Sequence, residues 1–411
     1  MAVGTSSYKN THGLMEISRF SNCKLIKMFG KARNHIKRLY HADNLIVLQN
    51  LLHDSSVKGH VKLIYIDPPY NTGGDFENRN QEFAYSDKFS NEEYLSFMKE
   101  RLIIIRELLS DDGSIYVHLD SKMVFHVKLL MDEIFGSNNF RGMITRKKCK
   151  SKNYTKKTFG NISDYILFYS KSDNPIWNKP YDAWTSEKEK KEYPFIEPET
   201  GRRYKRVPIH APGTRNGATG SEWRGMMPPP GKHWQYTPDR LDEMDANNEI
   251  YWSSTGNPRR KIYLDQSKGI PVQDIWLDFL DINNQNSFQT GYPTEKNLDM
   301  LKLIIEASSN PGDLVLDCFA GSGTTLIAAE QLGRDWIGVD IGDVAISTII
   351  NRLANGSKRL SELPVNPKSR TELKIERSLF DDLDSDNTNE EDKVESSINY
   401  DFFEVKNSTV D

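Results

Sequence analysis

Apolar residues recur along this chain at two spacings that distinguish strands from helices. The apolar run at 61–66 predicts a buried strand, whereas apolar residues three or four apart predict helices over 91–109 and 297–307. By the same criteria, further strands are predicted at 39–43, 114–119, 164–169, 313–317 and 335–340, and further helices at 44–52, 122–135, 326–332 and 344–353. Strands and helices therefore alternate on both sides of a central segment that lacks this pattern.

The central segment, 170–289, is rich in Pro, Gly, Trp and Tyr, and helical periodicity fades there. Its run Pro228–Gly231 cannot lie inside a helix, because proline has no amide hydrogen and clashes with the preceding turn. We predict an irregular inserted module whose tryptophans mostly fill a small core.

The strand at 61–66 leads into the most informative residues of the chain, Asp67-Pro68-Pro69-Tyr70. In an open parallel sheet, ligands bind at the carboxyl ends of the strands. A carboxylate there can accept hydrogen bonds from the amine of a flat ring, and an aromatic side chain can stack on the ring. A strand that ends in Asp-Pro is a common turn, but two prolines followed by tyrosine are much rarer. We therefore interpret this segment as a catalytic site.

A second candidate site is the glycine turn at 317–325, between a strand and a helix. Gly321 and Gly323 permit close approach of a ligand, and Asp340, at the end of the next strand, can bind ribose hydroxyls. The third glycine of a dinucleotide fingerprint is missing, and so is the lysine of a phosphate-binding loop. The site has two acids, Asp317 and Asp340, and the turn contains no base. This charge suits a cationic nucleoside without phosphate. S-adenosylmethionine is such a ligand.

The net charge of −4 over 411 residues averages two unlike parts. Residues 371–411 hold 13 acids and 4 bases, a net of −9, so the rest of the chain carries +5. Within the rest, 141–160 has eight Lys or Arg and no acid, and further bases cluster at 201–206 and 258–261. Such clusters are often only solvated faces, but three of them between these two sites in the sequence favour binding to a phosphate backbone.

Composition limits the remaining functions. The three cysteines are far apart and predict neither a disulfide framework nor a zinc site, and we expect His118 and His126 to be structural rather than metal ligands. No run of 18 apolar residues and no apolar leader are present, so we expect a cytoplasmic protein without a membrane span.

Taken together, these motifs resemble amino-group DNA methyltransferases of the beta arrangement. The resemblance runs from about 39 to 353, and Asn71-Thr72-Gly73 extends it toward the modification (Mod) subunits of type III restriction systems and their solitary relatives. The segments that carry it are 67–73, 113–118, 291–296 and 317–324. The resemblance implies site-specific transfer of a methyl group from S-adenosylmethionine to N6 of an adenine flipped out of double-stranded DNA.

The implied fold is α/β: a doubly wound, mostly parallel Rossmann-like sheet of seven strands, one of them antiparallel. It is circularly permuted, with the catalytic half before the cofactor half. The expected divisions are an N-terminal arm (1–30), the catalytic half (31–169), the target-recognition insert (170–289), the cofactor half (290–370) and a flexible acidic tail (371–411). A homodimer and a separate restriction subunit are partners that the family allows.

Residue roles follow from the resemblance. The catalytic set is Asp67, Pro68, Pro69 and Tyr70. The cofactor set is Asp43, Thr294, Lys296, Asp317, Phe319, Ala320, Gly321, Gly323, Thr324 and Asp340. The DNA-binding set, from the basic clusters, is Arg146, Lys147, Lys148, Lys150, Lys152, Arg202, Arg203, Arg259 and Arg260. No metal is expected. Cys318 and Asn297 depart from the family pattern, since proline is usual at both places, and they put local backbone detail in doubt.

Several alternatives stay open. Methylation of cytosine N4 would use the same acceptors, although an acid at position 67 leans toward adenine because the cytosine enzymes more often carry serine there. An RNA or protein-amide methyltransferase shares related motifs, but the basic insert favours DNA. A dinucleotide-dependent oxidoreductase would need the missing glycine, and a DNA-binding regulator with a dead site would show no turnover.

Overall fold

The computed structural model describes residues 35–69, 90–150, 157–281, 295–354, 398 and 400–404 in full. It also describes the backbone of 6–10, 13–17, 23–29, 75–77, 83–86, 355 and 405. Tyr70, Lys152 and Thr294, three of the predicted site residues, lie outside these ranges. The chain divides into two compact units, 1–178 with 273–411, and 179–272.

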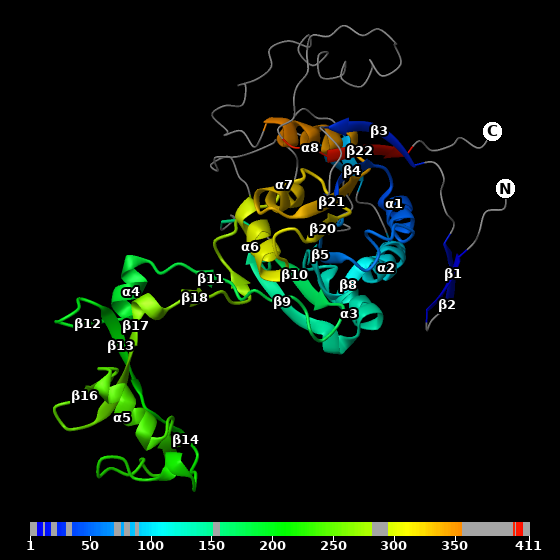
Figure 1. The fold of residues 1–411 in the computed structure, drawn as a ribbon. Helices are drawn as coiled ribbons and strands as arrows, with labels where there is room; N and C mark the ends of the chain where they lie inside the picture. Colours follow the sequence, from blue (N-terminus) through cyan, green and yellow to red (C-terminus); the bar gives the residue numbers. More distant parts are fainter. Residues whose placement is uncertain are drawn as a thin grey trace, which may run out of the picture. The chain divides into compact units, whose positions relative to one another are not determined.

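The first unit is built on one mixed sheet (Figure 1). In spatial order its strands are β19 (Ile275–Trp276), β9 (Phe140–Lys147), β10 (Ser163–Ser170), β8 (Leu109–Leu119), β5 (Val61–Ile66), β20 (Leu314–Asp317), β21 (Asp335–Asp340), β4 (Lys37–His41), β22 (Tyr400–Val405) and β3 (Cys23–Phe29). The six strands from β8 to β22 are parallel, whereas β10 and β3 are antiparallel to their neighbours. This is an α/β fold, but with ten strands in the described part of the chain instead of the expected seven.

Helices cover both faces of this sheet (Figure 1). One layer is formed by α1 (Asn44–Leu51), α2 (Asn91–Leu108) and α3 (Val124–Phe135), and the other by α6 (Leu298–Ser308), α7 (Thr324–Gln331) and α8 (Asp343–Asn355). The apolar stripes of α1 to α3 pack on the sheet in one large core, in which Met98, Leu102 and Ile105 of α2 are fully buried. Burying each such side chain stabilises the fold by about 1.5–3 kcal/mol.

Local signals set the ends of these elements. A capping box begins α2: the Ser90 hydroxyl accepts from the Glu93 amide, and the Glu93 carboxylate accepts from the Ser90 amide. Asn297 accepts from the amides of Asp299 and Met300 at the start of α6. The departure from proline at position 297 therefore supplies a helix cap.

The acidic tail was expected to be flexible, and for part of it that expectation is wrong. Residues Tyr400–Val405 form β22, which lies between β4 and β3. Phe403 stacks on Tyr40 at 4.6 Å between ring centroids, and Tyr400 packs near Trp336. The apolar residues in this short run give a strand that can be buried in the sheet, and the strand β3 from the expected N-terminal arm pairs with it. The segment 371–397 lies outside the described residues.

The second unit, 179–272, lies inside the range 170–289 expected for the insert. Its elements are β11 (Tyr181–Asp182), α4 (Ser186–Glu192), β12 (Phe195–Ile196), β13 (Arg203–Pro208), β14 (His210–Pro212), β15 (Lys232–Trp234), α5 (Pro238–Ala246), β16 (Ile250–Trp252), β17 (Pro258–Tyr263) and β18 (Ile270–Pro271). Trp223 and Trp234 are buried in a small core with Ile209 and Leu241, as predicted for the tryptophans.

Short elements complete the described structure. Two strand pairs stand apart from these sheets: β1 (Ser6–Asn10) with β2 (Gly13–Ile17), and β6 (Asp75–Glu77) with β7 (Phe83–Ser86). Single 3-10 turns lie at Ser137–Asn139, Ala218–Gly220 and Leu264–Gln266. Among the described residues, no helix combines the length and the apolar character that crossing a membrane would require.

Candidate active site

Three acids lie at the carboxyl edge of three adjacent strands. Asp67 follows β5, Asp317 ends β20 and Asp340 ends β21, and β20 lies between the other two strands. The apolar, buried residues of each strand fix its position in the sheet, and the acid emerges where the strand ends. The two motifs predicted from the sequence, 250 residues apart at Asp67 and Asp317, therefore meet at one edge.

Asp67 is half-buried and its carboxylate is paired with a cation. Its Oδ2 atom lies 2.6 Å from the Nζ of Lys296, which is itself buried. The two prolines after it restrict the backbone φ angles, so the carbonyl groups of this edge are held in place. Lys296 was expected to contact the cofactor, and the structure places its ammonium group on the carboxylate of Asp67.

Asp317 organises the glycine turn from inside. Its Oδ1 accepts from the amide of Phe319, and its Oδ2 accepts from the hydroxyl of Thr325 at 2.6 Å. The side chain is 2% exposed, and burial raises the pKa of Asp317 to about 7 despite these hydrogen bonds. Nearby Asp67 and Asp340 raise it further. This end of the site therefore favours a bound positive charge, which would offset the cost of ionising Asp317.

Asp340 ties the glycine turn to the next loop. Its Oδ2 accepts from the amide of Gly321 at 2.8 Å, and its Oδ1 accepts from the amide of Gly342 at 2.9 Å. Burial raises the pKa of Asp340, since amide hydrogen bonds only partly replace water. The glycine turn and the acid 19 residues after Gly321 are thus in direct contact.

The missing third glycine has a structural substitute. Leu326 stands in its place on α7, and Gly338 of β21 lies opposite. A Cβ atom on Gly338 would come within 2.4 Å of the Leu326 side chain, so the glycine on the strand provides the space. The helix therefore approaches the sheet closely without a glycine of its own. Gly323 has a left-handed φ of 74°, which glycine adopts without strain.

A buried arginine joins the glycine turn to the segment before α6. The Nη1 atom of Arg352 on α8 donates to the carbonyl of Ser322 at 2.8 Å and to the hydroxyl of Thr324 at 3.0 Å. The same atom lies 3.4 Å from Oε1 of Glu295. Burial lowers the pKa of Arg352. Lys296, next to Glu295, is thus carried on a segment that is fastened to the glycine turn.

Sequence reasoning missed a group around Asp43. Asp43 caps α1 by accepting from the Leu45 amide, and Asn44 donates to the carbonyl of Cys318 beside the glycine turn. Arg101 of α2 donates to Asn44 at 2.6 Å and lies 3.4 Å from Asp43. Its guanidinium stacks on Phe97, which packs near Phe319. Arg101 could have been found because it is a charged residue on the apolar face of a predicted helix.

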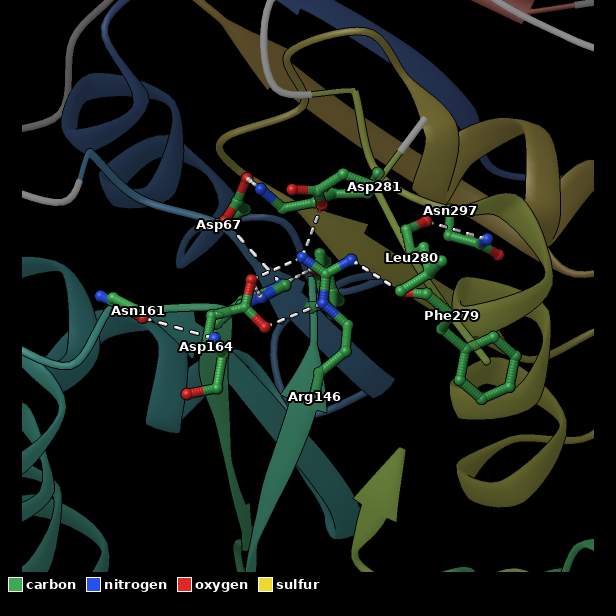
Figure 2. Close-up of polar contacts among 12 residues, drawn as sticks. Asp67, Arg146, Asn161, Asp164, Phe279, Leu280, Asp281 and Asn297 are labelled. Atoms are coloured by element: carbon green, nitrogen blue, oxygen red, sulfur yellow. Dashed lines mark hydrogen bonds and ion pairs between the residues drawn. The ribbon is translucent and has the colours of Figure 1, made fainter. Parts of the chain in front are cut away.

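The structure also corrects the role expected for Arg146. This residue was placed in the DNA-binding set, but its side chain is buried and pairs with Asp164 through two nitrogens (Figure 2). It also donates to Asp281 and to the carbonyl of Phe279. A guanidinium held by these internal partners cannot reach a phosphate, because leaving them would strand a buried carboxylate.

The segment 61–351 matches the family model described as DNA methylase. That segment contains both Asp67 and the glycine turn, the two motifs that the sheet brings together. The chain belongs to the DNA methylase family.

Its relatives among characterised proteins agree with this assignment. The chain is 50% identical to a type II methyltransferase, M.EcaI of Enterobacter cloacae, over 82% of this chain and 74% of that protein. It is 31% identical to the Mod subunit of the type III restriction-modification enzyme StyLTI of Salmonella typhimurium, over 71% of this chain and 49% of that protein. It is 30% identical to the type II methyltransferase M.KpnI of Klebsiella pneumoniae, over 72% of this chain and 76% of that protein.

In this DNA methyltransferase, two of the three predicted basic clusters are brought to paired strands of the second unit. Strands β13 and β17 of the second unit pair side by side, so that Val207 lies opposite Arg260 and Pro208 opposite Arg259. Arg259 is exposed, whereas Arg202 is held by two contacts to Asp265. The other predicted members in the described part of the chain, Arg203, Arg260, Lys147, Lys148 and Lys150, are half-buried or exposed.

Proposed function

We propose that this DNA methyltransferase transfers a methyl group from S-adenosylmethionine to N6 of adenine in double-stranded DNA. The observation that carries the proposal is the position of Asp67, one strand away from the glycine turn, with Pro68 and Pro69 behind it. An acceptor for an amine and a site for a cationic nucleoside then share one edge. The seven strands from β9 to β4, with β10 antiparallel, are proposed to be the permuted family sheet.

The residues of the turn suit S-adenosylmethionine. Asp317 and Asp340 provide negative charge, and the described turn from Asp317 to Thr325 contains no Lys or Arg that would favour a phosphate. Asp340 would accept from ribose hydroxyls, while Phe319, Ala320, Gly321, Gly323 and Thr324 would line the ligand. When bound, S-adenosylmethionine supplies an activated methyl group on a positively charged sulfur.

The target amine needs help because its lone pair is delocalised into the ring. Asp67 would accept one amine hydrogen and the carbonyl of Pro68 the other, which favours a pyramidal nitrogen with an available lone pair. The rigid backbone holds both acceptors before the base arrives. The base must leave the helix stack to reach them, and Tyr70, outside the described residues, is proposed to stack on it.

Lys296 must yield a carboxylate oxygen during this step. Its ammonium group lies on Oδ2 of Asp67, where an amine hydrogen could also bind. We propose that the incoming base shares or displaces this contact.

The second unit is the proposed DNA-reading module, and its proposed phosphate contacts are the exposed Arg259 and the half-buried Arg203 and Arg260 on the paired strands β13 and β17. The likeness to Mod subunits also supports a proposal that any DNA cutting is done by a separate restriction subunit. On the family resemblance, a second copy of this chain is also a proposed partner.

The test is product analysis. DNA is incubated with the protein and isotope-labelled S-adenosylmethionine, digested to nucleosides and measured by mass spectrometry. We expect label in N6-methyladenine. Label in N4-methylcytosine instead would overturn the adenine assignment, and label in neither base would overturn the proposed reaction. Sequencing that maps the methylated positions then gives the recognition site.

A further inference from the structure

A row of buried polar side chains lies behind Asp67, along the same edge of the sheet. It consists of His118 on β8, Asp164 on β10 and Arg146 on β9, with Tyr65 of β5 beside His118. These strands are neighbours in the sheet in the order β5, β8, β10 and β9. The row therefore runs from the strand that leads to Asp67 across the next three strands. In the sequence these residues stand at strand ends, and His118 was expected to be only structural.

His118 is the member of this row that faces the catalytic carboxylate. Its Nδ1 atom lies 2.7 Å from the hydroxyl of Tyr65 and 4.0 Å from Oδ1 of Asp67. Its Nε2 atom lies 3.0 Å from Oδ2 of Asp164. The imidazole is completely buried, so these neighbours on both nitrogens fix its orientation.

The far end of the row is held by charge. Arg146 binds both oxygens of Asp164, and also Asp281 and the carbonyl of Phe279 (Figure 2). Although burial opposes ionisation, His118 and Arg146 hold the pKa of Asp164 well below its usual range. Asp164 is therefore a fixed anion against which the imidazole is placed.

We propose that His118 is a positioning residue for the methyl transfer, acting through Asp67. Lys296 contacts Oδ2 of Asp67 on one side, and the Tyr65–His118 pair stands next to Oδ1 on the other. The carboxylate is thus confined between two polar groups, and Asp164 and Arg146 keep the second of them from turning away. This inference rests on the proposed role of Asp67 as acceptor of the target amine.

The same distances argue against a proton relay. A separation of 4.0 Å between His118 Nδ1 and Asp67 Oδ1 is too long for a hydrogen bond. Asp164, next in the row, is held ionised by Arg146, and a guanidinium does not pass protons on. Asp67 itself is partly exposed, so a proton taken from the amine can leave to solvent.

The experiment measures single-turnover methylation at saturating cofactor and DNA, with the affinities measured separately. We expect His118→Leu to lower the transfer rate about 10–100-fold, since misplacing a reacting group by about 1 Å can cost that much. The dissociation constants for S-adenosylmethionine and DNA should stay within about 2-fold of the parent values. His118→Asn, which keeps a polar group near the Nδ1 position, should recover part of the loss.

Two further variants keep the test decisive. His126→Leu, an exposed histidine on α3, is the matched control and should leave the rate unchanged. Tyr65→Phe removes only the hydroxyl and should lower the rate in the same direction, which decides the matter if His118→Leu does not fold. An unchanged rate in a folded His118→Leu protein, or in Tyr65→Phe if His118→Leu does not fold, would overturn the proposal. So would a loss that lies wholly in cofactor affinity.

Failure of this inference can be told from failure of the proposed function. If Asp67→Ala is inactive and His118→Leu is normal, only the positioning role is wrong. If Asp67→Ala retains the parent rate, the role of Asp67 is wrong, and the positioning role falls with it.

Discussion

Three carboxylates stand on adjacent strands of one sheet edge, yet they have different kinds of partner. Asp317 and Asp340 are bound by amides and a hydroxyl, and burial raises the pKa of both. Asp67 is bound by the ammonium group of Lys296, with His118 nearby. On the cofactor side, a bound cation would therefore favour ionisation of the two buried acids, whereas on the target side Lys296 pairs with the carboxylate before any ligand binds.

This contrast teaches how one edge can serve two ligands. A sulfonium and an aromatic amine bind best in different surroundings. The sulfonium is stabilised by carboxylates that have no cation of the protein beside them, and the amine by an oriented hydrogen-bond acceptor. Placing the two motifs on neighbouring strands brings the ligands together, while separate partners keep their electrostatics distinct. Variants on each side should accordingly affect different steps.

The largest effect is expected on the target side. Asp67→Ala should lower the transfer rate by about 100-fold or more, because it removes an oriented acceptor for the amine. Cofactor affinity should stay within a few-fold, as measured by calorimetric titration. Asp111→Ala, at a side chain that is 96% exposed, is the control. A normal transfer rate in Asp67→Ala would show that Asp67 is not the acceptor for the amine, and the contrast between the two sides would be wrong.

On the cofactor side, Asp340→Ala should act mainly on binding. It removes the acceptor proposed for the ribose hydroxyls and frees the Gly321 amide from its partner. The dissociation constant for S-adenosylmethionine should rise about 10–100-fold, since a hydrogen bond to a charged group contributes about 1.5–3 kcal/mol. The rate at saturating cofactor should change much less. Asp343→Ala, three residues later and exposed, is the control, and equal losses in both variants would refute a specific role.

Lys296→Met tests whether the lysine serves the target side or the cofactor side. If its contact with Asp67 is what matters, the transfer rate should fall about 10-fold while cofactor affinity is kept, because a close ion pair in a partly buried site fixes the acceptor. Lys62→Met, on the strand that leads to Asp67, breaks a more exposed ion pair with Asp112 of β8 and should leave both quantities unchanged. Weaker cofactor binding at an unchanged maximal rate would return Lys296 to the cofactor set.

The last prediction concerns the cofactor side and is a pH dependence of stability from Asp317. Its pKa is raised from 3.8 to about 7, so the folded state binds the proton more tightly than the unfolded state between these values. The free energy of unfolding should therefore fall as pH rises from about 4 to 7, by at most about 1.4 kcal/mol per pH unit. Urea unfolding of the parent and of Asp317→Asn at several pH values should show a flatter profile in the variant. Identical profiles would contradict the raised pKa.

Local signals made much of the fold predictable. The strand at Val61–Ile66 has the predicted ends, and α2 begins at its capping box and ends within one residue of the prediction. Gly321 and Asp340, which the sequence assigned to one candidate site, are in contact. These features depend on residues close in sequence, whose spacing and chemistry restrict the backbone directly.

Other features depend on which distant segments meet. The strand Tyr400–Val405 was predicted to be part of a flexible acidic tail. The sequence did not reveal the strand because its pairing with β4 involves residues more than 350 positions away. Arg146 was one base in a run of eight, and only its pairing with Asp164 made it an interior residue. Composition describes the charge of a segment but not the direction in which each side chain points.

The sequence by itself determined the two motifs, the strands that carry them and the family to which the chain belongs. The tertiary structure decided that Lys296 lies on Asp67, that His118 stands behind it and that ten strands form the sheet. The physical reason is that hydrophobic spacing and turn residues act along the chain. Ion pairs and the order of strands in the sheet depend instead on which distant segments are buried together. A buried charge needs a partner, and only the fold decides which residue is near enough to be one.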